Sequence, residues 1–138
     1  MSYLLDTNVL SEARKQRGEQ NVKDWLASVS SRELYLSVLI LGEIRQGIER
    51  LRPRDRAQAQ LYETWLVALS RDYADRILPI TPEIADEWGR LNAPDPLPAV
   101  DGLLAATAKV MRLTLVTRNT RDLARTGVAL LNPFAPLP

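Results

Sequence analysis

The 138-residue chain contains no cysteine and no histidine. The absence of cysteine excludes disulfides, zinc–thiolate sites and a thiol nucleophile. The absence of histidine excludes serine–histidine catalysis and imidazole acid–base chemistry. Any enzymatic chemistry therefore depends on carboxylates, hydroxyls, lysine, arginine or a metal held by oxygen atoms. Oxygen ligands favour hard cations such as Mg²⁺ or Mn²⁺.

A strong charge imbalance and long apolar runs are absent as well. The formal net charge is +1, from 18 basic and 17 acidic residues, which neither indicates nor excludes a nucleic-acid partner. The N-terminus shows no signal peptide and no apolar run reaches the length of a membrane span, so we expect a cytoplasmic protein without membrane contact. The length suits a single domain over residues 1–138, and the composition is typical of a soluble globular protein.

Short apolar segments alternate with amphipathic ones, which predicts an α/β fold with a parallel sheet covered on both faces. We expect about five strands, at residues 3–5, 34–37, 77–80, 114–116 and 128–131. Helices are expected at 9–14, 21–30, 38–51, 53–75, 81–91 and 99–112. Pro53 is expected in the first turn of its helix, and the proline at position 79 predicts an edge strand.

Four acidic residues stand where a predicted strand ends or the following helix begins. Asp6 ends the first strand, and Glu43 lies in the apolar opening of the helix after the second strand. Asp101 opens a helix after a proline-rich loop, and Asp122 follows the strand that ends at Thr117. In a parallel sheet these junctions meet at the edge where ligands bind.

Carboxylates gathered at one edge repel one another, and a divalent cation removes that repulsion. Two such ions can flank a phosphate and stabilise its attacking and leaving oxygens. Each acid also has an ordinary alternative role: Asp6 and Asp122 could cap local turns, Glu43 could be solvated, and Asp101 could complement the positive end of its helix. The four acids together favour a metal site.

The sequence resembles the PIN-domain proteins, specifically the VapC-type toxins of bacterial and archaeal toxin–antitoxin modules, in their FitB-like branch. Five segments carry the resemblance: LDTNVLSE at 5–12, LGEIRQG at 41–47, DGLLAATA at 101–108, TRNTRDL at 117–123 and LNPF at 131–134. The first segment alone is weak, but the four longer segments in this order are specific to the family and span nearly the whole chain.

The resemblance implies a three-layer α/β/α PIN domain with Mg²⁺- or Mn²⁺-dependent endoribonuclease activity, in which a metal-activated water hydrolyses the phosphodiester. It assigns metal binding and catalysis to Asp6, Glu43 and Asp101. Many family members carry another acid at the position of Asn119, where this chain has an amide and Asp122 supplies the charge three residues later. Supporting polar groups are expected from Thr7, Asn8, Thr117 and Asn119, and substrate contacts from Arg14, Arg45, Arg118 and Arg121.

The resemblance also implies partners. These are an RNA substrate, with transfer and ribosomal RNA among the family's targets, a cognate antitoxin protein that blocks the site, a second copy in a homodimer, and DNA only through the antitoxin. Trp25, Trp65 and Trp88 could line an antitoxin surface, although ordinary packing is the favoured explanation for them.

Two other functions stay open. A catalytically weak PIN fold could act as a binding module through its antitoxin in DNA-bound autoregulation, and the amide at Asn119 leaves room for that. A phosphatase with Asp6 as nucleophile would carry a second acid at position 8, where this chain has Asn8.

Overall fold

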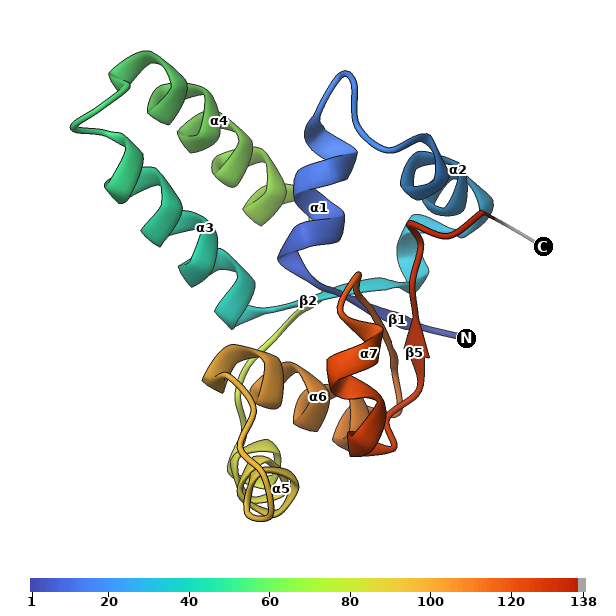
Figure 1. Ribbon diagram of the computed structural model, residues 1–138. Coiled ribbons are helices and arrows are strands. Elements are labelled where there is room, and N and C mark those ends of the chain that lie inside the picture. The colour runs from blue at the N-terminus through green and yellow to red at the C-terminus, as the bar shows by residue number, and fades with distance from the viewer. Residues whose placement is uncertain (137–138) are drawn as a thin grey trace.

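The computed structural model describes residues 1–136, which form a five-stranded sheet with helices on both faces (Figure 1). The strand order is β3-β2-β1-β4-β5, and every neighbouring pair is parallel. This confirms the predicted parallel sheet and places the proline-bearing segment at its edge. The strands are β1 (Tyr3–Leu5), β2 (Leu34–Ser37), β3 (Ile77–Leu78), β4 (Thr114–Val116) and β5 (Leu130–Leu131).

Seven α-helices flank the strands within residues 1–136. In Figure 1, α1 and α2 lie above the sheet, α5, α6 and α7 lie below it, and α3 and α4 form a hairpin at one side. None of the helices in this range is long and apolar enough to span a bilayer. The helices are α1 (Thr7–Arg14), α2 (Gln20–Ser28), α3 (Val38–Leu51), α4 (Arg56–Asp72), α5 (Pro82–Asn92), α6 (Ala99–Met111) and α7 (Thr120–Leu123).

The central strand β1 lies between two layers of helices, so its apolar side chains are largely removed from water. Leu4 and Leu5 are fully buried, as is Leu36 in the neighbouring strand β2. Capping side chains stabilise the starts of several helices. Ser37 Oγ accepts a hydrogen bond from the Leu39 amide at 3.1 Å at the start of α3, a contact that serine commonly makes there.

The prediction for Pro53 is wrong. Pro53 lies in the turn between α3 and α4, and α4 begins at Arg56. The amides of Arg54 and Asp55 bond back to the Leu51 carbonyl at 2.9 and 2.8 Å, which extends the turn past the proline. Asp55 then caps α4, because its carboxylate accepts a hydrogen bond from the Gln58 amide at 3.0 Å.

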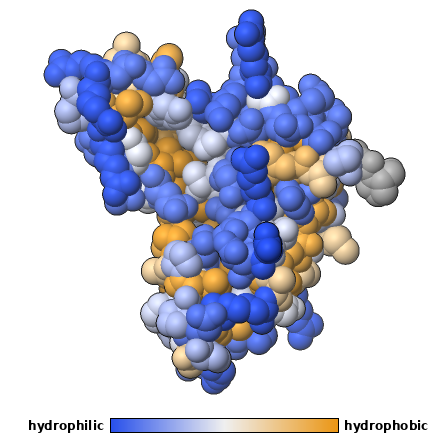
Figure 2. Space-filling view, viewed as in Figure 1, coloured by the Kyte–Doolittle hydropathy of each residue, from blue (hydrophilic) through white to orange (hydrophobic). Residues whose placement is uncertain are grey.

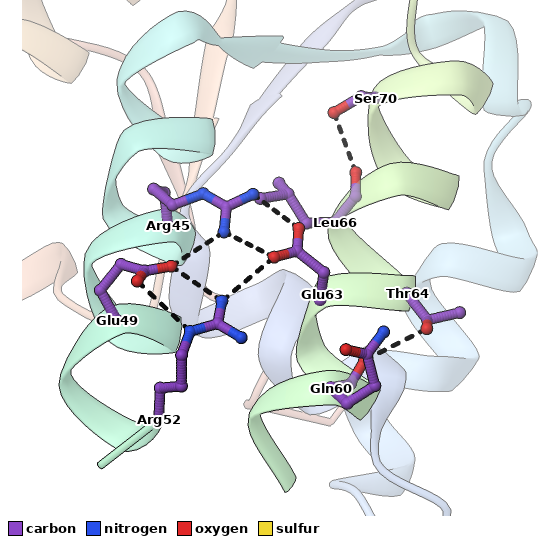
Figure 3. Close-up of polar contacts among 8 residues, drawn as sticks. All are labelled: Arg45, Glu49, Arg52, Gln60, Glu63, Thr64, Leu66 and Ser70. Atoms are coloured by element: carbon purple, nitrogen blue, oxygen red, sulfur yellow. Dashed lines mark hydrogen bonds and ion pairs between the residues drawn. The ribbon is translucent and has the colours of Figure 1, made fainter. Parts of the chain in front are cut away.

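Four charged side chains join the two helices of the α3–α4 hairpin (Figure 3). Arg45 donates to both carboxylate oxygens of Glu63, at 2.7 and 2.6 Å, and also to Glu49 at 3.1 Å. Arg52 donates to Glu49 at 2.9 Å and to Glu63 at 3.3 Å. Single exposed ion pairs stabilise a fold only weakly, and this network adds polar links between two helices that also pack against each other.

Helices α5 and α6 pack closely at Gly102. A Cβ at this position would lie 2.7 Å from Asn92 Nδ2 and 3.0 Å from Trp88 Nε1. Asn92 is itself buried: its amide nitrogen donates to the Trp88 carbonyl and its amide oxygen accepts from the Leu97 amide, both at 2.8 Å. Asn92 thus ties down the proline-rich loop that precedes α6, and the missing side chain of Gly102 gives it room.

We expect Gly102→Ala to lower the free energy of unfolding by about 1–3 kcal/mol, because the new methyl group overlaps Asn92. The matched control is Gly89→Ala in α5, where an added Cβ meets nothing within 4 Å. That change should be neutral or stabilising by up to about 1 kcal/mol, since alanine favours helix. Urea unfolding followed by circular dichroism measures both effects, and equal effects of the two changes would contradict the close packing at Gly102.

Candidate functional site

Asp6 lies at the carboxyl end of the central strand and is almost fully buried, with 7% of its surface exposed. Its Oδ1 accepts a hydrogen bond from the Thr7 amide at 2.7 Å, which caps α1. Its Oδ2 accepts from the Thr117 hydroxyl at 2.8 Å, just after β4. Asp6 therefore has the capping role considered as its alternative, and it also faces a second segment of the site.

Glu43 reaches the same edge from α3. The Thr7 hydroxyl donates to Glu43 Oε1 at 2.7 Å, across 36 positions in the sequence. The hydroxyl of Thr7 therefore contacts a site carboxylate, as expected for a supporting polar group. Thr7 links Asp6 to Glu43, since its amide contacts one carboxylate and its hydroxyl contacts the other.

Asp101, in the first turn of α6, joins the group through Asn119. The Asn119 side-chain amide donates to Asp101 Oδ2 at 3.4 Å, and the Asn119 backbone amide donates to the Thr117 hydroxyl at 3.0 Å. Asn8 lies beside these groups, and its amide nitrogen is 3.4 Å from Asp6 Oδ2. Four separate segments thus meet in one hydrogen-bonded chain at the carboxyl edge of the sheet.

The acids influence one another electrostatically. Burial raises the pKa of Glu43, the charges of Asp6 and Asp101 raise it further, and the hydrogen bond from Thr7 opposes the shift. Burial likewise raises the pKa of Asp101, with added repulsion from Asp6 and Asp122, while Asn119 lowers it. The group is therefore reluctant to carry all its negative charges at once.

Asp122 contributes charge without a direct contact to the other acids. It is exposed on α7, which begins at Thr120, so it lies inside the short helix and does not cap it as the alternative role would require. The side chain that touches Asp101 is Asn119. The position where many family members carry an acid thus contacts the site here through an amide.

The four arginines expected to contact substrate have different surroundings. Arg45 is held by Glu63 and Glu49, whose hydrogen bonds raise its pKa, so its guanidinium is already occupied. Arg14 stacks over the Tyr62 ring, and Arg118 stacks 4.6 Å over the Phe134 ring. Arg121 is exposed on α7 beside the site segment that contains Asn119. A substrate role for these arginines remains a prediction.

The side chains that could bind a metal ion here would do so through oxygen atoms, which suits a hard cation. Two of the carboxylates have raised pKa values, so a positive ion beside them would be favourable. Within residues 1–136, no group of three or more acidic side chains is already arranged to hold a metal ion. The hydroxyls of Thr7 and Thr117 and the amide of Asn119 occupy carboxylate oxygens instead. A cation would bind the remaining lone pairs of these oxygens or displace some of these hydrogen bonds.

The tryptophans expected at a partner surface fall into two groups. Trp25 is buried and packs edge-on against the Tyr3 ring at 5.0 Å, so it belongs to the core. Trp65 is half-buried and Trp88 is 37% exposed.

Two residues that matter for the site, Gly102 and Asn92, were not predicted from the sequence. They position the start of α6 and hence Asp101. A glycine directly after the acid in the first turn of a helix was the available signal.

Comparison with known proteins agrees with this geometry. Residues 3–129 match the family described as the PIN domain. Toxin FitB of Neisseria gonorrhoeae is 32% identical over 136 residues, which cover 95% of this chain and 97% of FitB. The VapC ribonuclease Y4jK of Sinorhizobium fredii is 30% identical, with 96% of this chain and 98% of the relative covered.

Solved structures give the same result. The crystal structure of FitAcB from Neisseria gonorrhoeae matches with a TM-score of 0.85 and 32% identity, over 96% of this chain and 98% of that one. The structure of FitAB bound to an IR36 DNA fragment matches with a TM-score of 0.89 and 29% identity, over 99% and 98%. On its sequence, its fold and its edge of acidic residues, this chain belongs to the PIN domain family.

Proposed function

We propose that this protein is a divalent-metal-dependent endoribonuclease and the toxin of a toxin–antitoxin pair. One observation carries the proposal: Asp6, Glu43 and Asp101 come from three distant segments and meet at one edge of the sheet through Thr7, Thr117 and Asn119. Relatives of at least 30% identity that are named as a toxin and as a VapC ribonuclease support the reaction class.

In this proposal Asp6, Glu43 and Asp101 hold Mg²⁺ or Mn²⁺, and the exposed Asp122 adds negative charge nearby. When bound, a divalent cation lowers the pKa of water and offsets charge on a phosphodiester, which is the chemistry that hydrolysis needs. The chain's own groups set the geometry. The Thr7 amide and the Thr117 hydroxyl orient the Asp6 carboxylate by donating to its two oxygens, and the Asn119 amide orients Asp101.

The substrate we propose is RNA in single strands or loops, whose bases are accessible to side chains. Arg118 and Arg121 lie on the segment that carries Asn119, where they can neutralise backbone phosphates. An antitoxin would cover the site. The similar FitAB structure holds a DNA fragment, which supports DNA contact through the antitoxin in this protein too. A homodimer acting in the cytoplasm completes the proposal.

Asp6→Asn and Asp101→Asn should each reduce metal-dependent RNA cleavage by at least about 100-fold, because each removes a charge that holds the cation. The assay is digestion of total RNA by purified, antitoxin-free protein with Mg²⁺ or Mn²⁺, followed by sequencing of the fragment ends. The matched control is Asp72→Asn at the exposed end of α4, which should cleave like the wild type. A folded wild-type protein that cleaves nothing with any divalent ion would favour the binding module instead.

Glu43→Gln should stabilise the metal-free protein at neutral pH by no more than about 0.5 kcal/mol, because it removes a repelled charge that solvent partly screens and keeps an oxygen for Thr7. The raised pKa means that the native state keeps this proton to higher pH than the unfolded chain does. The free energy of unfolding of the wild type therefore falls as the pH rises from about 4.5, the ordinary value for Glu43, through its raised pKa.

Thermal unfolding at several pH values tests this expectation. Mn²⁺ should raise the Tm of the wild type, more so as the pH rises and the carboxylates lose their protons, and should raise that of Glu43→Gln much less. The control is Glu33→Gln, which precedes β2 at the opposite end of the sheet. If Glu43→Gln is less stable than the metal-free wild type, the proposed charge repulsion at the site is wrong.

A further inference from the structure

A cavity of about 400 Å³ opens beside the acids, between α1, α3 and α4. Thr7 and Glu43 line one end of it, and Ile44, Ile48 and Leu51 of α3 give it an apolar side. In Figure 2 an apolar hollow is visible over the α3–α4 hairpin, between its two helices. Its volume is that of a small-molecule pocket, for which about 300 Å³ or more is usual. Because Glu43 and Thr7 belong both to the group of acids and to the cavity wall, an occupant of the cavity would lie directly beside the acids.

Two aromatic rings of α4 form the facing wall. Tyr62 and Trp65 lie with their ring centroids 6.2 Å apart. The Arg14 guanidinium from α1 sits 4.2 Å from the Tyr62 ring centroid and 5.5 Å from that of Trp65, and it donates to the Tyr62 hydroxyl at 3.0 Å. These contacts hold the rings in place before any ligand arrives. Fixed aromatic faces are the surfaces on which unpaired nucleic-acid bases stack.

Positive charge lies at the rim. Arg50 and Arg54 line the cavity, both are exposed, and neither forms an ion pair within residues 1–136. Their neighbours Arg45 and Arg52 are instead bound to Glu49 and Glu63 (Figure 3). Arg45 and Arg52 thus form ion pairs within the hairpin. Arg50 and Arg54 lie beside the cavity, unpaired among the described residues, and their positive charge there could bind a polyanion.

Gly47 keeps the wall of α3 open. It lines the cavity, and a Cβ added there would meet nothing within 4 Å. Glycine weakens the middle of a helix by roughly 0.5–1 kcal/mol relative to alanine, so local helix stability does not account for it. A larger side chain at this position would project into the empty space without displacing protein atoms at its Cβ.

We propose that this cavity binds one nucleotide of the RNA substrate, beside the phosphate that meets the acids. The inference rests on the proposed ribonuclease function. The base stacks against Tyr62 and Trp65, and its flanking phosphates are neutralised by Arg50 and Arg54. A peptide without acidic side chains could fill the apolar side, but it would leave the free cations at the rim unmatched. In this proposal the cavity holds the base on one side of the cleavage position, where its size and shape can favour one base over another.

The experiment measures the binding of four labelled RNA tetranucleotides, one for each base, to an Asp101→Asn background that does not cleave them. Adding Gly47→Leu fills the cavity and should weaken binding of the preferred tetranucleotide about tenfold or more, the loss expected for one stacked base. The matched control adds Gly89→Leu on α5, where a Cβ also meets nothing within 4 Å. This control should bind as the background does.

A second pair of variants keeps the test valid if Gly47→Leu does not fold. Trp65→Phe retains an aromatic face and should keep most of the affinity, while Trp65→Leu should lose about tenfold. In an otherwise wild-type chain, Trp65→Leu should also relax the base preference at one position beside the cut, read from sequenced fragment ends.

The outcomes separate the two proposals. If the wild type cleaves no RNA but Gly47→Leu still abolishes tetranucleotide binding, the nucleotide site stands and the nuclease proposal fails. If the wild type cleaves and Gly47→Leu binds and cleaves identically, the nuclease stands and the cavity takes another occupant, such as a peptide segment. If no tetranucleotide binds the Asp101→Asn protein, the nucleotide site is wrong.

Discussion

Negative charges gathered at the carboxyl end of β1 constrain the rest of this structure. Burial and mutual repulsion raise the pKa values of Glu43 and Asp101, so the fold must offset an unfavourable grouping of charge. It does so with hydroxyl and amide donors on the segments that follow β1 and β4. The surrounding layers hold these donors in place: β1 is buried between helices, and the α5–α6 contact fixes the start of the helix that bears Asp101.

Features with local signals are predictable from the sequence. The apolar strands, their parallel arrangement and the edge position of the strand that Pro79 follows are all predicted from residues within a few positions of one another. The positions of Asp6 at a strand end and of Glu43 and Asp101 early in helices belong to the same class, because a parallel sheet brings such junctions to one edge. Proline at position 53 shows the limit of such signals. Where a helix starts also depends on which nearby residue caps it, and here Asp55, two residues after the proline, caps α4.

Pairings between distant side chains are not predictable in this way. Nothing in the sequence near Arg45 shows that it meets Glu63, since that contact depends on the angle of the α3–α4 turn. The 2.7 Å hydrogen bond between Thr7 and Glu43 likewise depends on how α3 leaves β2. The room that Gly102 leaves for Asn92 exists only once α5 and α6 have packed. The cavity beside Glu43 depends on the same long-range geometry, because three helices form its walls.

The double role of Asp6 has a consequence for how this protein can change over evolutionary time. Glu43 and Asp101 are electrostatic burdens on the fold, but Asp6 caps α1 and accepts the hydroxyl of Thr117. A descendant that no longer needs catalysis can lose the carboxylate of Glu43 or of Asp101 and gain stability. It cannot replace Asp6 with an apolar residue without leaving the partly buried Thr7 amide and the buried Thr117 hydroxyl without their acceptor. Relatives that have drifted out of catalysis should therefore still carry a hydrogen-bond acceptor at this position, so its presence alone does not distinguish an active protein from a silent one.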